Sequence, residues 1–128
     1  MTKKDKKTLS TLPSILRFMV SIAADPRGYE STQMTVRSFY SCYRRFCQSN
    51  ELSGMLSLQG FSGQLHDSGI RGVVRDASME LEMPGMSQLR ESLISDLGLS
   101  KKFFKDDASL AAAIGKRSTG IAGDFKLL

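Results

Sequence analysis

Residues 34–74 decide the fold of this chain and read MTVRSFYSCYRRFCQSNELSGMLSLQGFSGQLHDSGIRGVV. In the first part of this stretch, apolar side chains recur at the three- and four-residue spacing of an amphipathic helix, at Val36, Phe39, Tyr40, Tyr43, Phe46 and Cys47. The pattern predicts a helix over residues 36–49, with Thr35 as its N-cap. Because the aromatic side chains share this stripe with aliphatic ones, we expect them to form core rather than a surface for stacking bases.

A second helix and a pair of short strands are expected to follow. The second helix, over residues 58–67 and capped by Ser57, is predicted from the spacing of Leu58, Phe61 and Leu65. Residues 70–74 are β-prone, and residues 79–83 alternate between apolar and charged side chains after a turn. Two helices followed by two strands predict a mainly α fold, a winged helix-turn-helix with a small two-stranded wing.

Further helices are expected on both sides of this motif. Apolar spacing predicts one over residues 12–23, one from the N-cap Ser87 to the C-cap Gly98, and a last one over residues 108–114 capped by an aspartate. Residues 1–8 are rich in lysine and lack apolar spacing, so we expect a disordered arm whose removal leaves stability unchanged. The expected organisation is an arm (1–8), a winged-helix-like domain (9–115) and a flexible tail (116–128).

The net charge of +5 is unevenly distributed. Residues 1–75 carry eleven lysines and arginines against five acidic residues, whereas residues 76–128 carry seven against eight. The basic excess therefore coincides with the helix-turn-helix and the arm before it, as in a protein that binds a polyanion. The alternative is a protein with a basic tail that binds nothing acidic.

Chemistry-bearing residues are too sparse to predict an enzyme. The single histidine, His66, is expected at the exposed end of a helix. Around Ser62, Gly60 stands two residues before the serine, but Gln64 occupies the position two residues after it, where a nucleophile elbow requires a second glycine. The cysteines, Cys42 and Cys47, are five residues apart on one helix, so we expect two reduced thiols. Neither a catalytic set, a metal site nor a cofactor is expected.

The second helix of such a motif enters the major groove of DNA. Turning its apolar stripe inward leaves Gln59 and Gln64 facing outward, where their amides can hydrogen-bond adenine edges. Residues 58–67 contain no lysine or arginine, so other segments must supply the attraction to phosphates. The candidate DNA-binding residues are Lys3, Lys4, Lys6, Lys7, Arg44, Arg45, Gln59, Gln64, Arg71 and Arg75.

The run Phe39-Tyr-Ser-Cys-Tyr-Arg-Arg-Phe-Cys47, followed by Leu56-Ser-Leu and by Phe61, Leu65 and Gly69 at four-residue spacing, resembles one group of known domains. These are the C-terminal winged-helix domains of origin-recognition initiator ATPases and of phage and plasmid primase-helicases. The resemblance covers about forty residues and rests mostly on core positions. It implies the winged-helix fold and a module that contacts duplex DNA or packs against a partner, without the ATPase of the parent proteins.

The leading interpretation is a DNA-binding protein that acts in replication or transcription of a virus or mobile element, with duplex DNA as its first candidate partner. The first alternative is a protein–protein adaptor on the same scaffold that docks through the methionine-rich residues 79–86. The second is an RNA-binding or viral assembly protein. The apolar run over residues 15–24 is too short to span a bilayer and lacks a good cleavage site, so no membrane association and an intracellular location, cytoplasmic or nuclear, are expected.

Overall fold

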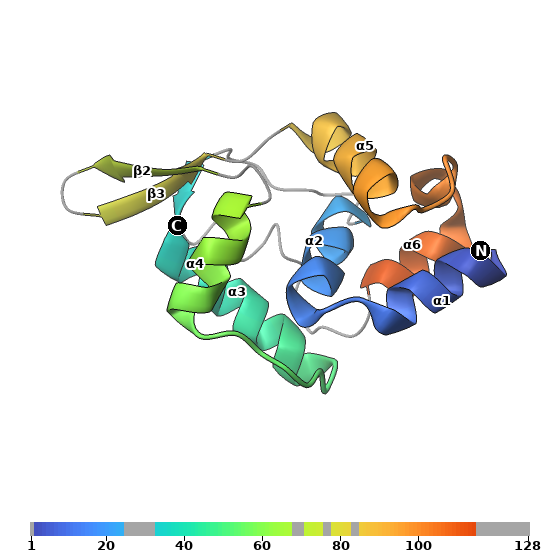
Figure 1. Ribbon diagram of the computed structural model, residues 1–128, viewed down its shortest axis with the longest axis horizontal. Coiled ribbons are helices and arrows are strands. Elements are labelled where there is room, and N and C mark those ends of the chain that lie inside the picture. Colours follow the sequence, from blue (N-terminus) through green and yellow to red (C-terminus); the bar gives the residue numbers. More distant parts are fainter. Residues whose placement is uncertain (1, 25–32, 68–70, 76–77, 83–84, 115–128) are drawn as a thin grey trace.

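The computed structural model describes residues 2–24, 33–67, 71–75, 78–82 and 85–114, with backbone alone in the strand residues 33–34, 71–75 and 78–82. The chain is mainly helical, as predicted (Figure 1). The described elements, in chain order, are α1 (Lys3–Thr11), α2 (Ser14–Ala24), β1 (Gln33–Thr35), α3 (Val36–Ser49), α4 (Leu58–Asp67), β2 (Arg71–Arg75), β3 (Ser78–Glu82), α5 (Met86–Leu97), a 3-10 turn η1 (Phe103–Lys105) and α6 (Asp107–Ile114).

Helices α3 and α4 have the predicted bounds, and their apolar stripes are buried against each other and against α2. The ring of Phe61 on α4 is fully buried and stacks on Tyr43 of α3, with the ring centroids 4.8 Å apart. Phe18 of α2 lies 5.2 Å from Phe39 and 5.7 Å from Phe46 by the same measure. One aromatic cluster therefore joins three helices, which confirms that the stripe of α3 is core.

The sheet has three strands rather than the two expected from the sequence. Strands β2 and β3 pair antiparallel, with Val74 opposite Met79, and β1 pairs antiparallel with the other edge of β3, with Met34 opposite Leu81. The sequence interpretation treated the β1 residues as a connection because three residues are too few to show a two-residue period. Figure 1 shows the hairpin extending beyond α4 at one end of the molecule.

The lysine-rich N-terminus is not the disordered arm that its composition indicates. Residues 3–11 form α1, and the hydroxyl of Thr2 caps this helix by accepting a hydrogen bond from the backbone N–H of Asp5 at 3.0 Å. The Asp5 side chain is 1% exposed, and its carboxylate accepts bonds from the backbone N–H of Ser100 at 3.0 Å and from the Ser100 hydroxyl at 2.7 Å. Periodicity of apolar residues misses this helix because a carboxylate occupies the centre of its buried face.

The remaining helix boundaries are set by caps. Helix α5 begins after Gly85 rather than at the predicted cap Ser87, and it ends at Gly98, whose φ of 69° is the left-handed conformation predicted for a C-cap. Helix α6 is capped by Asp106, whose carboxylate accepts a bond from the backbone N–H of Ser109 at 3.0 Å. Helix α2 begins at Ser14, two residues after the predicted start, and the predicted stop after α4 and the predicted tail lie outside the described residues.

Candidate nucleic-acid interface

The outward face of α4 is polar, as its apolar spacing predicts. Gln59 and Gln64 are exposed, while Phe61 and Leu65 on the opposite side are buried. His66 is also exposed, and its Nδ1 atom lies 4.0 Å from a carboxylate oxygen of the equally exposed Asp67. The structure therefore confirms the predicted orientation of the two amides, and the helix carries one carboxylate and no fixed positive charge on this side.

Two glycines keep the outward face of α4 small. A Cβ atom added at Gly63 would meet nothing within 4 Å, so this glycine is not required by packing inside the protein. A Cβ at Gly60 would lie 3.5 Å from the Ser57 hydroxyl, an ordinary van der Waals contact. Glycine weakens a helix interior by about 0.5–1 kcal/mol relative to alanine, and it allows a ligand to approach the backbone closely.

Two tyrosines of α3 hold the loop that leads into α4. The hydroxyl of Tyr43 accepts a bond from the backbone N–H of Leu56 at 2.8 Å and lies 2.6 Å from the hydroxyl of Ser14. The hydroxyl of Tyr40 donates to the carbonyl of Leu56 at 2.8 Å. Both polar groups of the Leu56 backbone are thus fixed just before α4 begins, and burial raises the pKa of Tyr43 above its usual value.

The sequence interpretation assigned these two tyrosines to the core and missed their hydroxyl groups. The available signal was the choice of tyrosine over phenylalanine at two positions of a buried stripe, since a buried phenol usually finds a hydrogen-bond partner. The partners themselves are far along the chain from Tyr43, at Ser14 and Leu56. Their identity therefore depends on the folded arrangement rather than on local spacing.

Replacing Tyr43 with phenylalanine is expected to lower the free energy of unfolding by about 1–2 kcal/mol, because the half-buried N–H of Leu56 loses its acceptor and the buried hydroxyl of Ser14 loses one of its partners. The change should be read from urea unfolding monitored by far-ultraviolet circular dichroism. Tyr40→Phe serves as the comparison, because Tyr40 is only half-buried and its loss leaves a carbonyl rather than an N–H without a partner. Equal, near-zero effects of the two substitutions would contradict the role of Tyr43.

The arginines predicted to contact phosphates lie on two elements next to α4. Arg44 and Arg45 are exposed on α3, and a guanidinium N–H of Arg45 also reaches the Sγ atom of Cys42 at 3.7 Å. Arg71 and Arg75 are the first and last residues of β2, with side chains outside the described part of the chain. Strand β2, which carries these two arginines, is in contact with helix α4.

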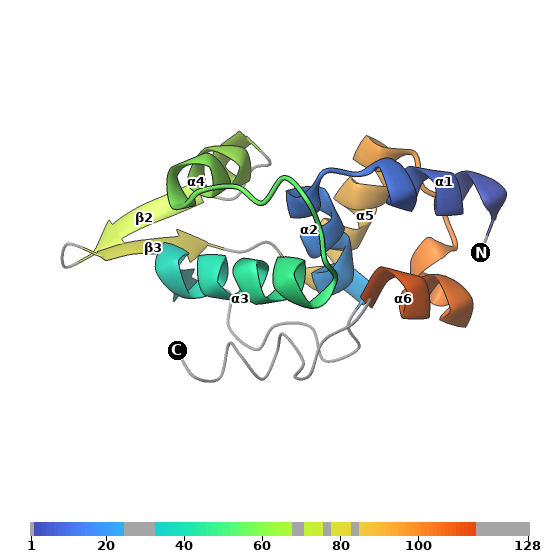
Figure 2. The ribbon, with the colours of Figure 1, turned by 90° about the horizontal axis from the view of Figure 1, so that it is seen from below.

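The four predicted N-terminal lysines do not join this surface. Lys3, Lys4, Lys6 and Lys7 are exposed on α1, and Figures 1 and 2 show α1 and α4 on opposite sides of α2 along the long axis of the molecule. The sequence interpretation grouped these lysines with the arginines near α4, and the structure does not bring the two groups together (Figures 1 and 2). That interpretation treated the lysines as a mobile arm able to reach the motif, whereas the bonds between Asp5 and Ser100 hold α1 in place.

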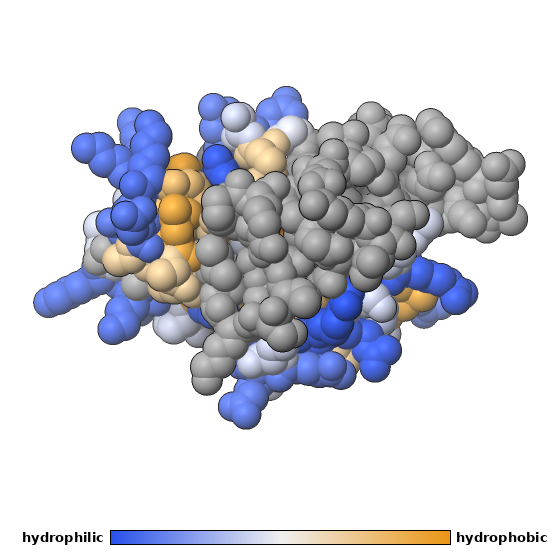
Figure 3. Space-filling view, turned by 180° about the vertical axis from the view of Figure 1, so that it is seen from behind, coloured by the Kyte–Doolittle hydropathy of each residue, from blue (hydrophilic) through white to orange (hydrophobic). Residues whose placement is uncertain are grey.

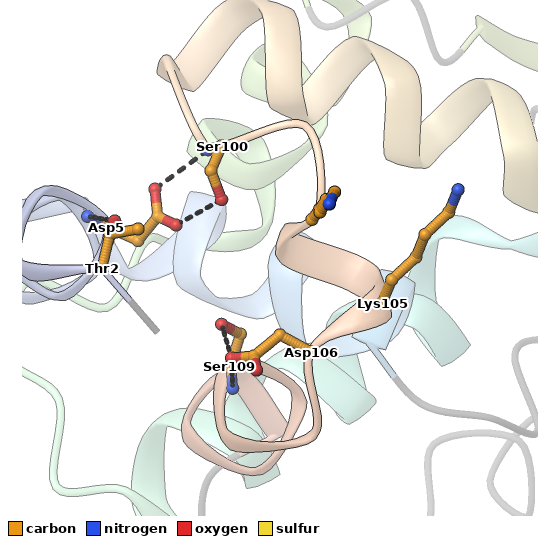
Figure 4. Close-up of a pocket in the computed structure, with 7 residues that line it drawn as sticks. Thr2, Asp5, Ser100, Lys105, Asp106 and Ser109 are labelled. Atoms are coloured by element: carbon orange, nitrogen blue, oxygen red, sulfur yellow. Dashed lines mark hydrogen bonds between the residues drawn. The ribbon is translucent and has the colours of Figure 1, made fainter.

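A polar hollow of about 450 Å³ lies between the start of α1 and the start of α6 (Figure 4). Its two carboxylates, of Asp5 and Asp106, are each bonded to a serine, and the bonds from Ser109 lower the pKa of Asp106 to about 2. Neither carboxylate is thus placed as a proton donor or acceptor near neutral pH. Each serine hydroxyl in the hollow donates to a carboxylate whose pKa is lowered, and such a carboxylate is a weak base for activating it.

Other chemistry is equally sparse in the described part of the chain. Cys42 and Cys47 are buried thiols outside any disulfide, and burial raises the pKa of Cys47, which keeps it in the unreactive protonated form. Among the residues with described positions, no three histidine, cysteine, aspartate or glutamate side chains gather to hold a metal ion. Within the same residues, every helix is too short or too polar to cross a bilayer.

Comparison of the chain with protein-family models, with curated proteins and with solved structures finds no match.

Proposed function

We propose that this chain is a DNA-binding module of the winged-helix type, with α4 as the helix that enters the major groove. The observation that carries the proposal is the arrangement α2–β1–α3–α4–β2–β3, in which two packed helices are followed by an antiparallel hairpin whose inner strand also pairs with β1. A helix-turn-helix presents its second helix to the groove, and α4 presents only polar and small side chains outward.

The chemistry of the surface supports separate roles for its residues. The amides of Gln59 and Gln64 can each donate to and accept from an adenine edge, which fits direct reading of bases. Gly63 leaves room for α4 to lie close to the floor of the groove. Arg44 and Arg45 are exposed on α3, the helix that packs against α4, and their charge fits contacts to phosphates that position the protein without reading sequence.

A second candidate function, a protein–protein adaptor, is favoured by one observation. The outward face of α4 carries no lysine or arginine and ends in the exposed carboxylate of Asp67. A partner protein would bind this face through hydrogen bonds and shape, with little dependence on salt. Duplex binding that neutralises several phosphates falls steeply as salt rises, so the salt dependence separates the two functions.

Replacing Gln64 with alanine is expected to change the preference for one base pair by about 1–3 kcal/mol, with little change at other positions. The measurement is selection of bound sequences from a random duplex pool, followed by fluorescence anisotropy on the selected duplex and its single-base variants. Gln88→Ala is the matched control, since Gln88 is an exposed glutamine on α5, away from α4. We expect the control to bind like the parent chain.

Two outcomes would overturn the proposal. In the first, the parent chain selects no sequence from the pool and shows no preference for duplex over single-stranded DNA or RNA of the same sequence. In the second, a preferred sequence emerges but Gln64→Ala and Gln88→Ala shift it equally. Either result would remove α4 as the reading helix.

A further inference from the structure

The fold gathers most of the lysines of the chain at the end of the molecule opposite α4. Seven of its nine lysines lie on α1 or in the segment from the end of α5 to η1, against three aspartates in the same segments and at the start of α6. The lysines are Lys3, Lys4, Lys6, Lys7, Lys101, Lys102 and Lys105, all exposed. We call this set the lysine end. Figure 3 shows hydrophilic side chains projecting from that end of the molecule.

Helix geometry explains why the lysines of α1 point outward. At 3.6 residues per turn, positions 3, 4, 6 and 7 cover an arc of about 160° whose centre is opposite position 5. Asp5 is buried and bonded to Ser100, and Leu9 on the same side is 4% exposed. Anchoring α1 through Asp5 therefore presents all four ammonium groups to solvent at once.

The same anchor brings the second group of lysines to the same end. Asp5 binds Ser100, and the next residues in the chain, Lys101 and Lys102, are exposed beside it. Lys102 and Lys105 line the polar hollow together with Thr2 and Asp5 (Figure 4). In the folded chain, the four lysines near the N-terminus therefore share one surface with three lysines that lie about one hundred positions later in the sequence.

Three carboxylates, of Asp5, Asp106 and Asp107, offset part of the charge of the seven lysines and leave an excess of positive charge at this end. Asp5 is buried against Ser100, and the carboxylate of Asp106 is bonded to Ser109. Among the residues whose side chains are described, no carboxylate lies within ion-pair distance of a lysine of the lysine end. The positive field there is available to a polyanion from outside.

We propose that the lysine end is a second, sequence-independent binding surface for the phosphate backbone of nucleic acid, separate from the α4 face. Lysine neutralises phosphates as a compact point charge without reading base edges. A helix that lies on a membrane surface also buries an apolar face in the lipid, but the apolar residue of α1, Leu9, packs into the protein core. On α1, therefore, the described side chains offer positive charge without an apolar face, which fits contact with phosphates.

If α4 binds duplex DNA as proposed above, the lysine end lies apart from α4 along the long axis of the molecule and can contact a second segment of nucleic acid (Figures 1 and 2). One molecule would then hold two duplex segments together. This step rests on the proposed function, whereas phosphate binding by the lysine end does not.

The test uses the full chain with Lys3, Lys4, Lys6 and Lys7 replaced together by glutamine. Glutamine keeps helix propensity close to that of lysine, and the bonds of Thr2 and Asp5 are untouched. The matched control replaces the same four residues by arginine, which keeps the charge. Binding of a random-sequence duplex is measured by anisotropy between about 50 and 200 mM salt, the range over which phosphate contacts change affinity most visibly. Circular dichroism checks that both variants are folded.

We expect the glutamine variant to bind about tenfold or more weakly at low salt and to lose about 2–4 from the slope of log affinity against log salt, while the arginine control matches the parent chain. Equal binding by all three chains at every salt concentration would overturn the proposal. Vesicles with and without phosphatidylserine give a second readout, and loss of vesicle binding without loss of duplex binding would also overturn it, in favour of a lipid surface.

A final measurement separates this proposal from the proposed function. Gln64→Ala should change sequence preference while leaving the random-sequence salt slope intact, and the glutamine variant should do the reverse. Capture of a labelled duplex by protein already held on a bead-bound duplex tests bridging. One possible result is that the parent chain prefers no sequence and that the glutamine variant loses the salt-dependent binding. This result would support phosphate binding by the lysine end and contradict the role of α4. If the parent chain prefers a sequence and the glutamine variant keeps its salt-dependent binding, the role of α4 is supported and phosphate binding by the lysine end is contradicted.

Discussion

Replacing Phe61 with alanine is expected to lower the free energy of unfolding by about 3–5 kcal/mol, the cost of removing a large aromatic side chain from a packed core. Phe61 is fully buried, and its ring centroid lies within 5.6 Å of those of Phe39, Tyr40 and Tyr43. Because Phe61 lies between α4 and the rings of α3, its removal leaves a cavity at the contact between the two helices. Urea unfolding followed by circular dichroism gives the value.

Gln59→Ala on the same helix is the control, and its exposed position predicts a change within about 0.5 kcal/mol. Phe61→Leu should fall between the two, because it restores part of the lost volume. A loss below 1 kcal/mol for Phe61→Ala would contradict the packing of α4 on the aromatic cluster. It would also remove the basis for treating α3 and α4 as one rigid unit.

The helices α3 and α4 could be predicted from the sequence because their information is local. Their apolar stripes repeat over several turns, and their caps, Thr35 and Ser57, each accept a bond from the backbone N–H three residues later, at 3.2 Å in both cases. The outward direction of Gln59 and Gln64 follows from the same stripe. Prediction from spacing succeeds wherever burial is decided by residues on the same helix.

The errors arise where burial is decided by residues far apart in the chain. Strand β1 exists because β3, more than forty residues later, offers it an edge. Helix α1 is anchored by Ser100, and its buried face is centred on the charged Asp5, which hydropathy counts as exposed. The placement of the lysines relative to α4 depends on that anchor. The sequence therefore predicted which residues carry positive charge but not that they form a separate surface.

The anchor leads to the second large expected effect. Replacing Asp5 with alanine should lower the free energy of unfolding by about 2–3 kcal/mol, because two half-buried donors of Ser100 lose a charged acceptor. Removing residues 1–8 should lower it at least as much, which reverses the expectation for a disordered arm. In a domain of this size the melting temperature should fall by about 10 °C. Glu91→Ala, at an exposed position on α5, should leave it nearly unchanged.

The pH dependence of the free energy of unfolding shows whether the charge of the Asp5 carboxylate, rather than only the presence of helix α1, stabilises the fold. Burial alone would raise the pKa of Asp5, but the hydrogen bonds from Ser100 outweigh it and hold the pKa below the usual value of 3.8. An aspartate with a lowered pKa contributes stability that is complete above its unfolded-state pKa and is lost as the pH falls below it. The gap in stability between the parent chain and Asp5→Asn should therefore be constant near neutral pH and narrow below about pH 4. Asp106, whose pKa is about 2, also makes the free energy of unfolding fall in acid. The comparison therefore uses the difference in free energy of unfolding between the two chains at each pH, in which the contribution of Asp106 cancels. A gap that stays constant down to pH 2 would show that Asp5 anchors α1 without its charge.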